Sequence, residues 1–304
     1  MSLIVGAYPA QPEGSQQRPF FEAMADVAAI RGLELPYRAA GGEPWPAGAP
    51  AEWSAVVTTI PGTMQRVGLD RHFGLASVDQ DGRRAAIDFT AGVRDYVTRL
   101  GDEGHRVEAV ALHSAPPRRG SPSAFAESLE EILAWDWSGT SLVVEHCDAP
   151  RPGRNPEKGF LPIQAEVDVV RSLKDRGYRV GILVNWARSV IETREIQTAA
   201  EHITYAREAG VLSGLMFSGC SAEATEFGYP WIDAHLPAIE VEGAPASSML
   251  NTREIARCLQ AAGELPIMGF KIGLPQDAVS AAERASLLRQ MCALVTGNVT
   301  AAQP

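Results

Sequence analysis

Eight short apolar runs alternate with longer amphipathic stretches along almost the whole chain. The runs are rich in Val, Ile and Leu and show little polar alternation, which is typical of strands covered on both faces. They are Leu3–Ala7, Gly32–Tyr37, Ala55–Ile60, Val107–Leu112, Ser141–Val144, Val180–Val184, Ser213–Phe217 and Ile267–Ile272. We therefore predict eight parallel strands, each followed by a helix or a long connection.

Alternating strands and helices form either a closed (β/α)8 barrel or an open doubly wound sheet. The open sheet usually carries a glycine-rich phosphate loop of the GxGxxG type after its first strand. Here the first run continues into GAYPAQP at residues 6–12, which contains two prolines and no such motif. We predict an α/β fold with one (β/α)8 TIM barrel over residues 1–304. Its long loops, at about 61–84 and 218–248, should lie on the active-site face.

Charge and composition argue against several classes of protein. The formal net charge of −10 does not suit a nucleic-acid binder, which needs a basic face. No run approaches the roughly 18 apolar residues of a membrane span, and the first residues lack the basic region and apolar core of a signal peptide. We expect a cytoplasmic protein with no nucleic-acid or membrane partner, and the sequence leaves a homo-oligomer open. Four isolated cysteines should be reduced thiols: Cys147, Cys220, Cys258 and Cys292.

Polar side chains follow five of the apolar runs at their carboxyl ends. Inward-facing side chains of barrel strands converge on one mouth, and a charge there is costly unless it is paired or used. The five strand ends carry His113, then Glu145 with His146, then Asn185, Trp186 and Arg188, then Ser218, and finally Lys271. Together they predict a site for a small polar molecule.

Side chains alternate along a strand, so only one of Glu145 and His146 can face inward, and we choose Glu145. Glu145 and Lys271 could instead form a structural ion pair across the mouth. The residues expected to bind substrate are Asn185, Trp186, Arg188, Asp148, Lys158, Ser218, Tyr229 and Trp231. The last two belong to an aromatic cluster in the loop 218–248, which could stack on a sugar ring or only hold the loop down.

The strand order and the segment Leu142-Val143-Val144-Glu145 resemble the xylose isomerase-like barrels, which include sugar isomerases, epimerases and related lyases. In that superfamily a glutamate on strand five, a carboxylate on strand six, a histidine on strand seven and a glutamate on strand eight hold one divalent metal. The resemblance implies that Glu145 is kept and that Asn185, Ser218 and Lys271 take the other three places. A protonated ammonium cannot bind a cation, so we expect no cofactor, with a divalent metal as the runner-up.

The leading hypothesis is a metal-independent isomerase, epimerase or lyase that moves a proton next to the carbonyl of a sugar or sugar derivative. Glu145 is then the general base, Lys271 holds the developing oxyanion, and His113 or His146 shuttles a proton. A second hypothesis is an aldolase-type lyase in which Lys271 forms a Schiff base. A third is a non-catalytic sugar-binding barrel or subunit.

Overall fold

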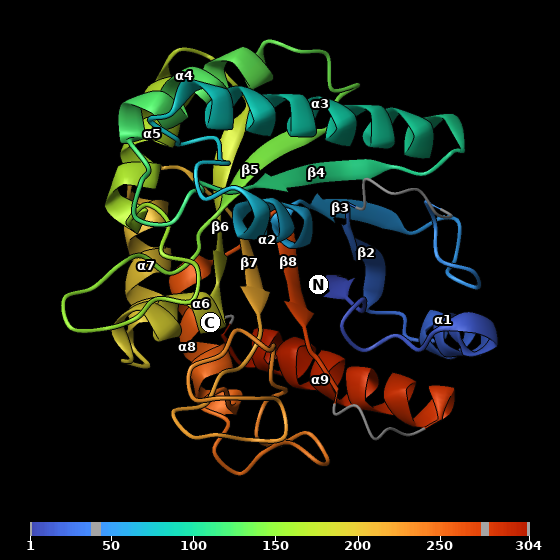
Figure 1. Ribbon diagram of the computed structural model, residues 1–304. Helices are drawn as coiled ribbons and strands as arrows, with labels where there is room; N and C mark the ends of the chain where they lie inside the picture. The colour runs from blue at the N-terminus through green and yellow to red at the C-terminus, as the bar shows by residue number, and fades with distance from the viewer. Residues whose placement is uncertain (1, 38–43, 275–279, 303–304) are drawn as a thin grey trace.

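The computed structural model describes residues 2–37, 44–274 and 280–302, and in it eight parallel strands form a closed barrel in the order of the sequence. The first strand pairs with both the second and the eighth, which closes the ring. The strands are β1 (Leu3–Gly6), β2 (Ile30–Pro36), β3 (Ser54–Thr58), β4 (Val107–Leu112), β5 (Ser141–Glu145), β6 (Val180–Asn185), β7 (Leu212–Phe217) and β8 (Ile267–Lys271), shown in Figure 1. The predicted (β/α)8 barrel is confirmed.

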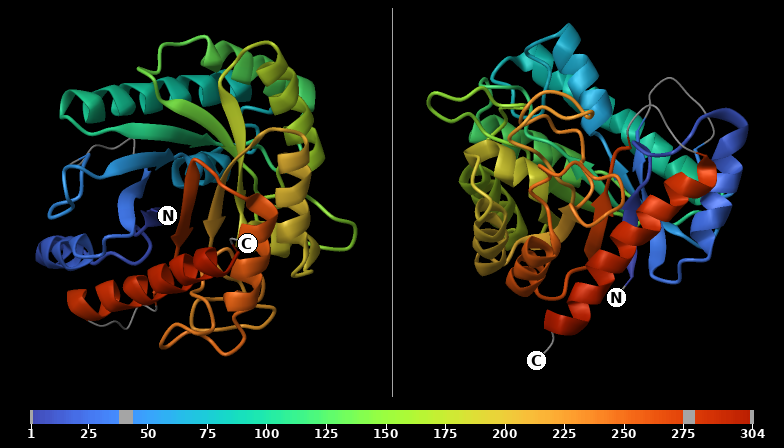
Figure 2. Two further views of the ribbon diagram at one scale, coloured as in Figure 1. Left: turned by 180° about the vertical axis from the view of Figure 1, so that it is seen from behind. Right: turned by 90° about the horizontal axis from the view of Figure 1, so that it is seen from below.

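Helices surround the strands and bury their apolar faces against the outside of the barrel (Figures 1 and 2). They are α1 (Gln17–Ala25, after a short 3₁₀ turn, Gly14–Gln16), α2 (Ile60–Leu69), α3 (Gln80–Asp102), α4 (Pro122–Leu133), α5 (Ile163–Asp175), α6 (Trp186–Thr193), α7 (Thr198–Glu208), α8 (Thr252–Ala262) and α9 (Ala281–Ala302). Among the described residues, none of these helices combines the length and the apolar character needed to cross a membrane.

Inside the barrel, one layer of apolar side chains forms a cluster separate from the outer core. Its members are Ile4, Val56, Ala109, Ala111, Val143, Leu183, Met216 and Ile267. Because side chains alternate along a strand, Glu145 lies above Val143 and Asn185 above Leu183, and both point into the barrel. The apolar layer is therefore the floor on which the polar mouth is built.

A glycine in β1 makes room for two charged side chains in this mouth. A Cβ atom at Gly6 would lie 2.8 Å from Cβ of Lys271 and 2.9 Å from Oε2 of Glu34. Both distances are shorter than real Cβ contacts, so a larger residue at this position would push Glu34 and Lys271 out of place.

The connections at the carboxyl ends of the strands differ in structure. The region 61–84, which the sequence reading treats as a loop, contains most of α2 and the beginning of α3. Pro61 lies in the first turn of α2, where its fixed φ angle suits a helix and no backbone N–H is needed. The connection 218–248 contains no helix or strand and lies at the carboxyl end of β7, in orange in Figure 1. Between β2 and β3, the described residues also contain no helix.

Candidate active site

Five charged or titratable side chains meet in the mouth, and we call them the central cluster: Glu34, His113, Glu145, Arg188 and Lys271. All five are buried. The ammonium of Lys271 lies 2.8 Å from Oε2 of Glu34 and 4.0 Å from Oε1 of Glu145. A guanidinium nitrogen of Arg188 lies 2.8 Å from the same Oε1 of Glu145. Two cations and two carboxylates thus alternate across the end of the barrel.

The carboxylate of Glu145 is held from several sides. Besides Arg188 and Lys271, the ring of His113 lies 2.9 Å from Oε2, and the amide of Asn185 lies 3.5 Å from Oε1. Burial alone would raise the pKa of Glu145, but Arg188, Lys271 and His113 together hold that pKa well below its usual range. Glu145 is therefore ionised at neutral pH and fixed in one orientation.

The imidazole of His113 is neutral and is held at both nitrogens. Burial lowers its pKa, and Glu145 only partly opposes this effect. Because Glu145 is ionised, Nε2 of His113 carries the proton and donates it to that carboxylate. Nδ1 lies 3.0 Å from the hydroxyl oxygen of Thr59, whose proton is donated to the carbonyl of Ala111 at 2.9 Å. His113 therefore orients Glu145, and neither of its nitrogens is left to shuttle a proton.

Glu34 and Lys271 form the other half of the cluster. Burial raises the pKa of Glu34, and this effect outweighs the opposite influence of Lys271. Burial alone would lower the pKa of Lys271, but the negative charge around it, that of Glu34 first, raises this pKa above its ordinary value. The ring of Tyr8 lies 5.4 Å from the ammonium and completes its surroundings. Lys271 is thus a permanent cation, whereas Glu34 is the carboxylate that accepts a proton more readily.

The mouth does not suit the divalent metal that the fold resemblance implies. The ammonium of Lys271 and the guanidinium of Arg188 both lie at Glu145, so two cations already fill the place. The hydroxyl of Ser218 donates to Oδ1 of Asn185 at 2.9 Å, so these two neutral groups are hydrogen-bonded to each other. Lysine and arginine offer no acceptor atom to a metal. We therefore derive no step through a metal at this position.

Loops cover the mouth on the side of β5, β6 and β7. Asp233, in the connection after β7, lies 3.0 Å from Nε of Arg188 and 3.1 Å from the ammonium of Lys158. Lys158 belongs to the connection after β5, where its backbone and that of Glu157 donate to the carboxylate of Asp148. Asp148, Lys158 and Arg188 were expected to bind substrate, but here they tie two loops to the barrel.

His146 lies outside the barrel wall, on the face of β5 opposite to Glu145. Its Nδ1 is 2.6 Å from Glu166 on α5, and its Nε2 is 3.2 Å from Glu192 on α6. Burial would lower the pKa of His146, but these two carboxylates raise it to about 10. The expected role of His146 at the mouth is not supported, because strand alternation turns its ring away from the central cluster.

A second histidine gives this group the composition of a metal site. Ligand atoms of His146, Glu192 and His202 all lie within 4.8 Å of one another, which singles out this trio among the described residues. Burial and the charge on His146 lower the pKa of His202 to about 3, so its ring is neutral. However, His146 is already protonated between two carboxylates, and it would have to lose that proton before binding a metal.

The three aromatic residues expected to bind substrate lie away from the central cluster. Trp186 is fully buried in the outer core, because it follows the cap residue Asn185 at the first position of α6. Tyr229 is exposed, and its hydroxyl donates to Glu157 at 2.7 Å. Trp231 packs against the outer core below the guanidinium of Arg194. Tyr229 and Trp231 therefore support their loop.

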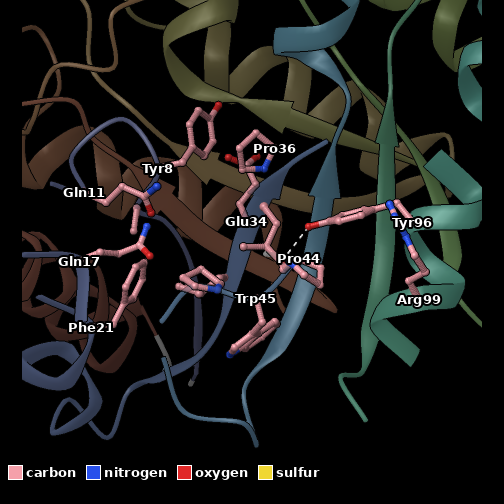
Figure 3. Close-up of a pocket in the computed structure, with 14 residues that line it drawn as sticks. Tyr8, Gln11, Gln17, Phe21, Glu34, Pro36, Pro44, Trp45, Tyr96 and Arg99 are labelled. Atoms are coloured by element: carbon pink, nitrogen blue, oxygen red, sulfur yellow. Dashed lines mark hydrogen bonds between the residues drawn. The ribbon is translucent and has the colours of Figure 1, made fainter. Parts of the chain in front are cut away.

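A cavity of about 260 Å³ lies on the side of β1 and β2, and Glu34 is the member of the central cluster that lines it (Figure 3). Glu34 and Tyr8 line one part of it, and Trp45, Tyr96 and Arg99 line another. It lies where no helix follows β2 in the described residues, so α1 and α3 flank an irregular connection. Of the two carboxylates in the central cluster, Glu34 lines this cavity and Glu145 does not.

Sequence reasoning missed several residues of this arrangement. Glu34 lies inside the apolar run Gly32–Tyr37, and a single charged residue in such a run could have indicated a functional position. Tyr8 directly follows the first strand and could have been included with the other strand ends. Asp233 and Glu192 gave no comparable signal, since they are ordinary acidic residues in a loop and on a helix.

Residues 4–287 match the family described as Domain of unknown function (DUF4862). The chain belongs to this family. One relative of this DUF4862 chain is the Uncharacterized protein STM3670 of Salmonella typhimurium (strain LT2). The two are 38% identical over 250 residues, which make up 77% of this chain and 77% of the relative.

Solved structures with the same fold include three that share little sequence with the DUF4862 chain. A xylose isomerase domain containing protein from Salmonella typhimurium LT2 has a TM-score of 0.61, 12% identity and 97% coverage of each chain. The IOLI protein with a binding zinc atom has a TM-score of 0.62, 11% identity and coverage of 98% and 99%. D-psicose 3-epimerase in the presence of D-fructose has a TM-score of 0.54, 14% identity and coverage of 99% and 97%. These likenesses confirm the resemblance to xylose isomerase-like barrels at the level of the fold.

Proposed function

We propose that this protein is a sugar isomerase or epimerase that moves a proton next to a carbonyl group without using a metal. The observation that carries the proposal is the Lys271 ammonium, which is fixed between Glu145 and Glu34, the carboxylate whose residue lines a cavity of about 260 Å³. In a water-poor site, a preorganised charge stabilises a developing oxyanion far better than it would in water. The names of the structural neighbours, a xylose isomerase domain protein and an epimerase, favour the same class of reaction.

We assign the proton transfer to Glu34 rather than to Glu145. Glu34 lines the cavity, and burial raises its pKa, which brings it nearer to the range useful for a general base. Glu145 is held by three groups that keep its pKa low, so it is the weaker base. Its role is to position Lys271 and Arg188, and His113 in turn positions Glu145.

The proposed step is a balanced proton transfer. Glu34 takes the proton from the carbon next to the substrate carbonyl, and the C–H electron pair forms the double bond of an enediolate. The carbonyl oxygen then carries the negative charge that Glu34 has lost, so Lys271 keeps two anionic neighbours throughout, one of which is always Glu145. Return of the proton to the former carbonyl carbon, together with transfer of the hydroxyl proton from the second oxygen to the first, gives the isomer. Return of the proton to the opposite face of the original carbon gives the epimer.

The state of Lys271 argues against the Schiff-base alternative. An imine forms only from the neutral amine, and the pKa of Lys271 is raised above its ordinary value by the anions around it. An ammonium held in this way is suited to charge stabilisation and poorly suited to nucleophilic attack.

The test is exchange of carbon-bound hydrogen in D2O, followed by NMR with a panel of aldoses and ketoses that includes D-fructose and D-psicose. We expect exchange on at least one sugar, and a fall of about 10²- to 10⁴-fold in the Glu34→Gln variant. Glu108→Gln is the matched control, since Glu108 is another ion-paired strand residue that does not line the cavity.

Two results would count against the proposal. Binding of sugars without exchange on any of them would favour a non-catalytic sugar-binding barrel. Exchange that disappears after treatment with a chelator, and returns with added metal, would show that a metal takes part.

A further inference from the structure

The part of the cavity that lies away from Glu34 is lined by aromatic rings that are held in place. Trp45 stacks on His105 with ring centroids 4.0 Å apart and planes at 8°, and its indole N–H donates to the carbonyl of Ala49. Tyr96 donates its hydroxyl to the carbonyl of Pro44, which fixes its ring beside the same connection. These contacts hold two aromatic rings in place, which is how rigid walls for a sugar ring are built.

Polar groups stand among these rings. The side-chain amides of Gln11, in the segment between β1 and α1, and of Gln17, the first residue of α1, extend toward the cavity (Figure 3). The amide oxygen of Gln17 accepts from the backbone N–H of Ala47 at 3.4 Å, which leaves its amide N–H groups. Together the two side chains offer both donors and acceptors, as hydroxyl groups require. The amides and the held rings together describe a site for a polyhydroxylated molecule.

Arg99 adds a positive charge to this wall. It lies in the last turn of α3, and its guanidinium is 5.8 Å from the centre of the Tyr96 ring. Among the described residues, no carboxylate forms an ion pair with Arg99, and the one acidic residue that lines the cavity, Glu34, is paired with Lys271. The planar guanidinium is well suited to binding a carboxylate through two parallel hydrogen bonds.

We propose that this cavity selects a sugar acid, with the sugar ring against Trp45, the carboxylate on Arg99 and the reacting carbon at Glu34. The volume of about 260 Å³ is below the roughly 300–1,000 Å³ of pockets for drug-sized ligands, so it suits a single sugar unit. The assignment of the reacting carbon rests on the proposed function. The selection of a carboxylate does not, because binding alone reveals it.

The test is isothermal titration calorimetry with D-glucuronate and D-glucose, which differ only in the carboxylate at carbon 6. We expect the wild-type protein to bind D-glucuronate at least about tenfold more tightly, in line with a charge-assisted hydrogen bond. Arg99→Gln should remove that preference and leave the affinity for D-glucose unchanged. Trp45→Ala should weaken the binding of both sugars. Arg94→Gln, a variant of the same helix whose side chain lies over Trp135 and not in the cavity, should keep the preference.

Equal affinity for the two sugars, no binding of either at millimolar concentration, or a preference that survives Arg99→Gln would each overturn the proposal. The outcome is separable from that of the exchange assay. Exchange on neutral sugars without any carboxylate preference would leave the proposed function standing and remove the sugar acid. A preference that depends on Arg99, without exchange on any sugar, would do the reverse.

Discussion

The two sides of the barrel mouth surround their carboxylates in different ways. On the side of β5 to β7, Glu145 is enclosed by Arg188, His113 and Asn185, and Asp233 fastens the covering loop to Arg188. On the side of β1 and β2, Glu34 lines a cavity, and its ion pair is with Lys271. One carboxylate is thus a fixed structural anion, and the other belongs to a buried residue that lines the cavity.

This difference shows that burial alone does not identify the reacting group. Both carboxylates are buried and both touch Lys271, yet their pKa values move in opposite directions because their other neighbours differ. The carboxylate with more partners is the better ion, and the carboxylate with fewer partners is the better base.

The sharpest test of the comparison is the stability of two matched variants. Glu145→Gln leaves Arg188 and Lys271 with one anionic neighbour fewer in a buried site, so we expect a loss of about 3–5 kcal/mol in the free energy of unfolding. Glu34→Gln should lose less than about 2 kcal/mol, because Lys271 keeps Glu145 and a carboxylate with a raised pKa is replaced. Urea unfolding measures both, and equal losses would contradict the distinction between the two sides.

The second prediction is that the free energy of unfolding depends on pH through His146, on the side of the barrel that carries β5. Burial would lower the pKa of His146, but Glu166 and Glu192 raise it from 6.5 to about 10. A raised pKa stabilises the fold fully below pH 6.5, and this stabilisation is lost as the pH rises toward 10. We expect the free energy of unfolding to fall in that window by up to about 1.4 kcal/mol per pH unit. His146→Gln should flatten the curve, and a wild-type curve that is already flat would show that His146 is neutral.

The smallest effect concerns the loop that covers Arg188. Lys158→Met removes one of the two cations at Asp233, so we expect a loss of about 1–2 kcal/mol and faster hydrogen exchange in residues 218–248. Lys174→Met is the control: Lys174 is exposed on α5 and its ammonium donates only to the carbonyl of Gly210, so the change in stability should be smaller, about 0.5 kcal/mol. Exchange in the loop that stays at the wild-type rate would mean that Arg188 alone holds Asp233.

The sequence predicts the barrel well because each apolar run corresponds to a strand that is buried on both faces. The strand ends at Glu145, Asn185 and Lys271 were also predictable, since alternation places them above an apolar layer. The clearest error concerns Trp186, which was expected at the mouth. Asn185 caps α6, so the residue after it already belongs to a helix and turns outward.

Contacts between distant segments could not be predicted in the same way. Glu166 and Glu192 reach His146 from two helices, and no local pattern distinguishes them from exposed acidic residues. Pro44, Trp45 and Pro46, in the connection between β2 and β3, line the cavity, and the composition of this segment predicts a loop but not its shape. The sequence therefore predicts which strands place polar side chains in the mouth, whereas contacts made by helices and loops determine where the cavity lies.

Lys271 has a consequence for the conditions under which such a protein could work. A cation that is part of the chain cannot dissociate, be removed by a competing chelator or be exchanged for the wrong ion. If the proposed isomerase relies on this cation, its activity should not depend on the supply of a divalent metal. The positive charge at the site is present in every folded copy of the protein, because it belongs to a side chain.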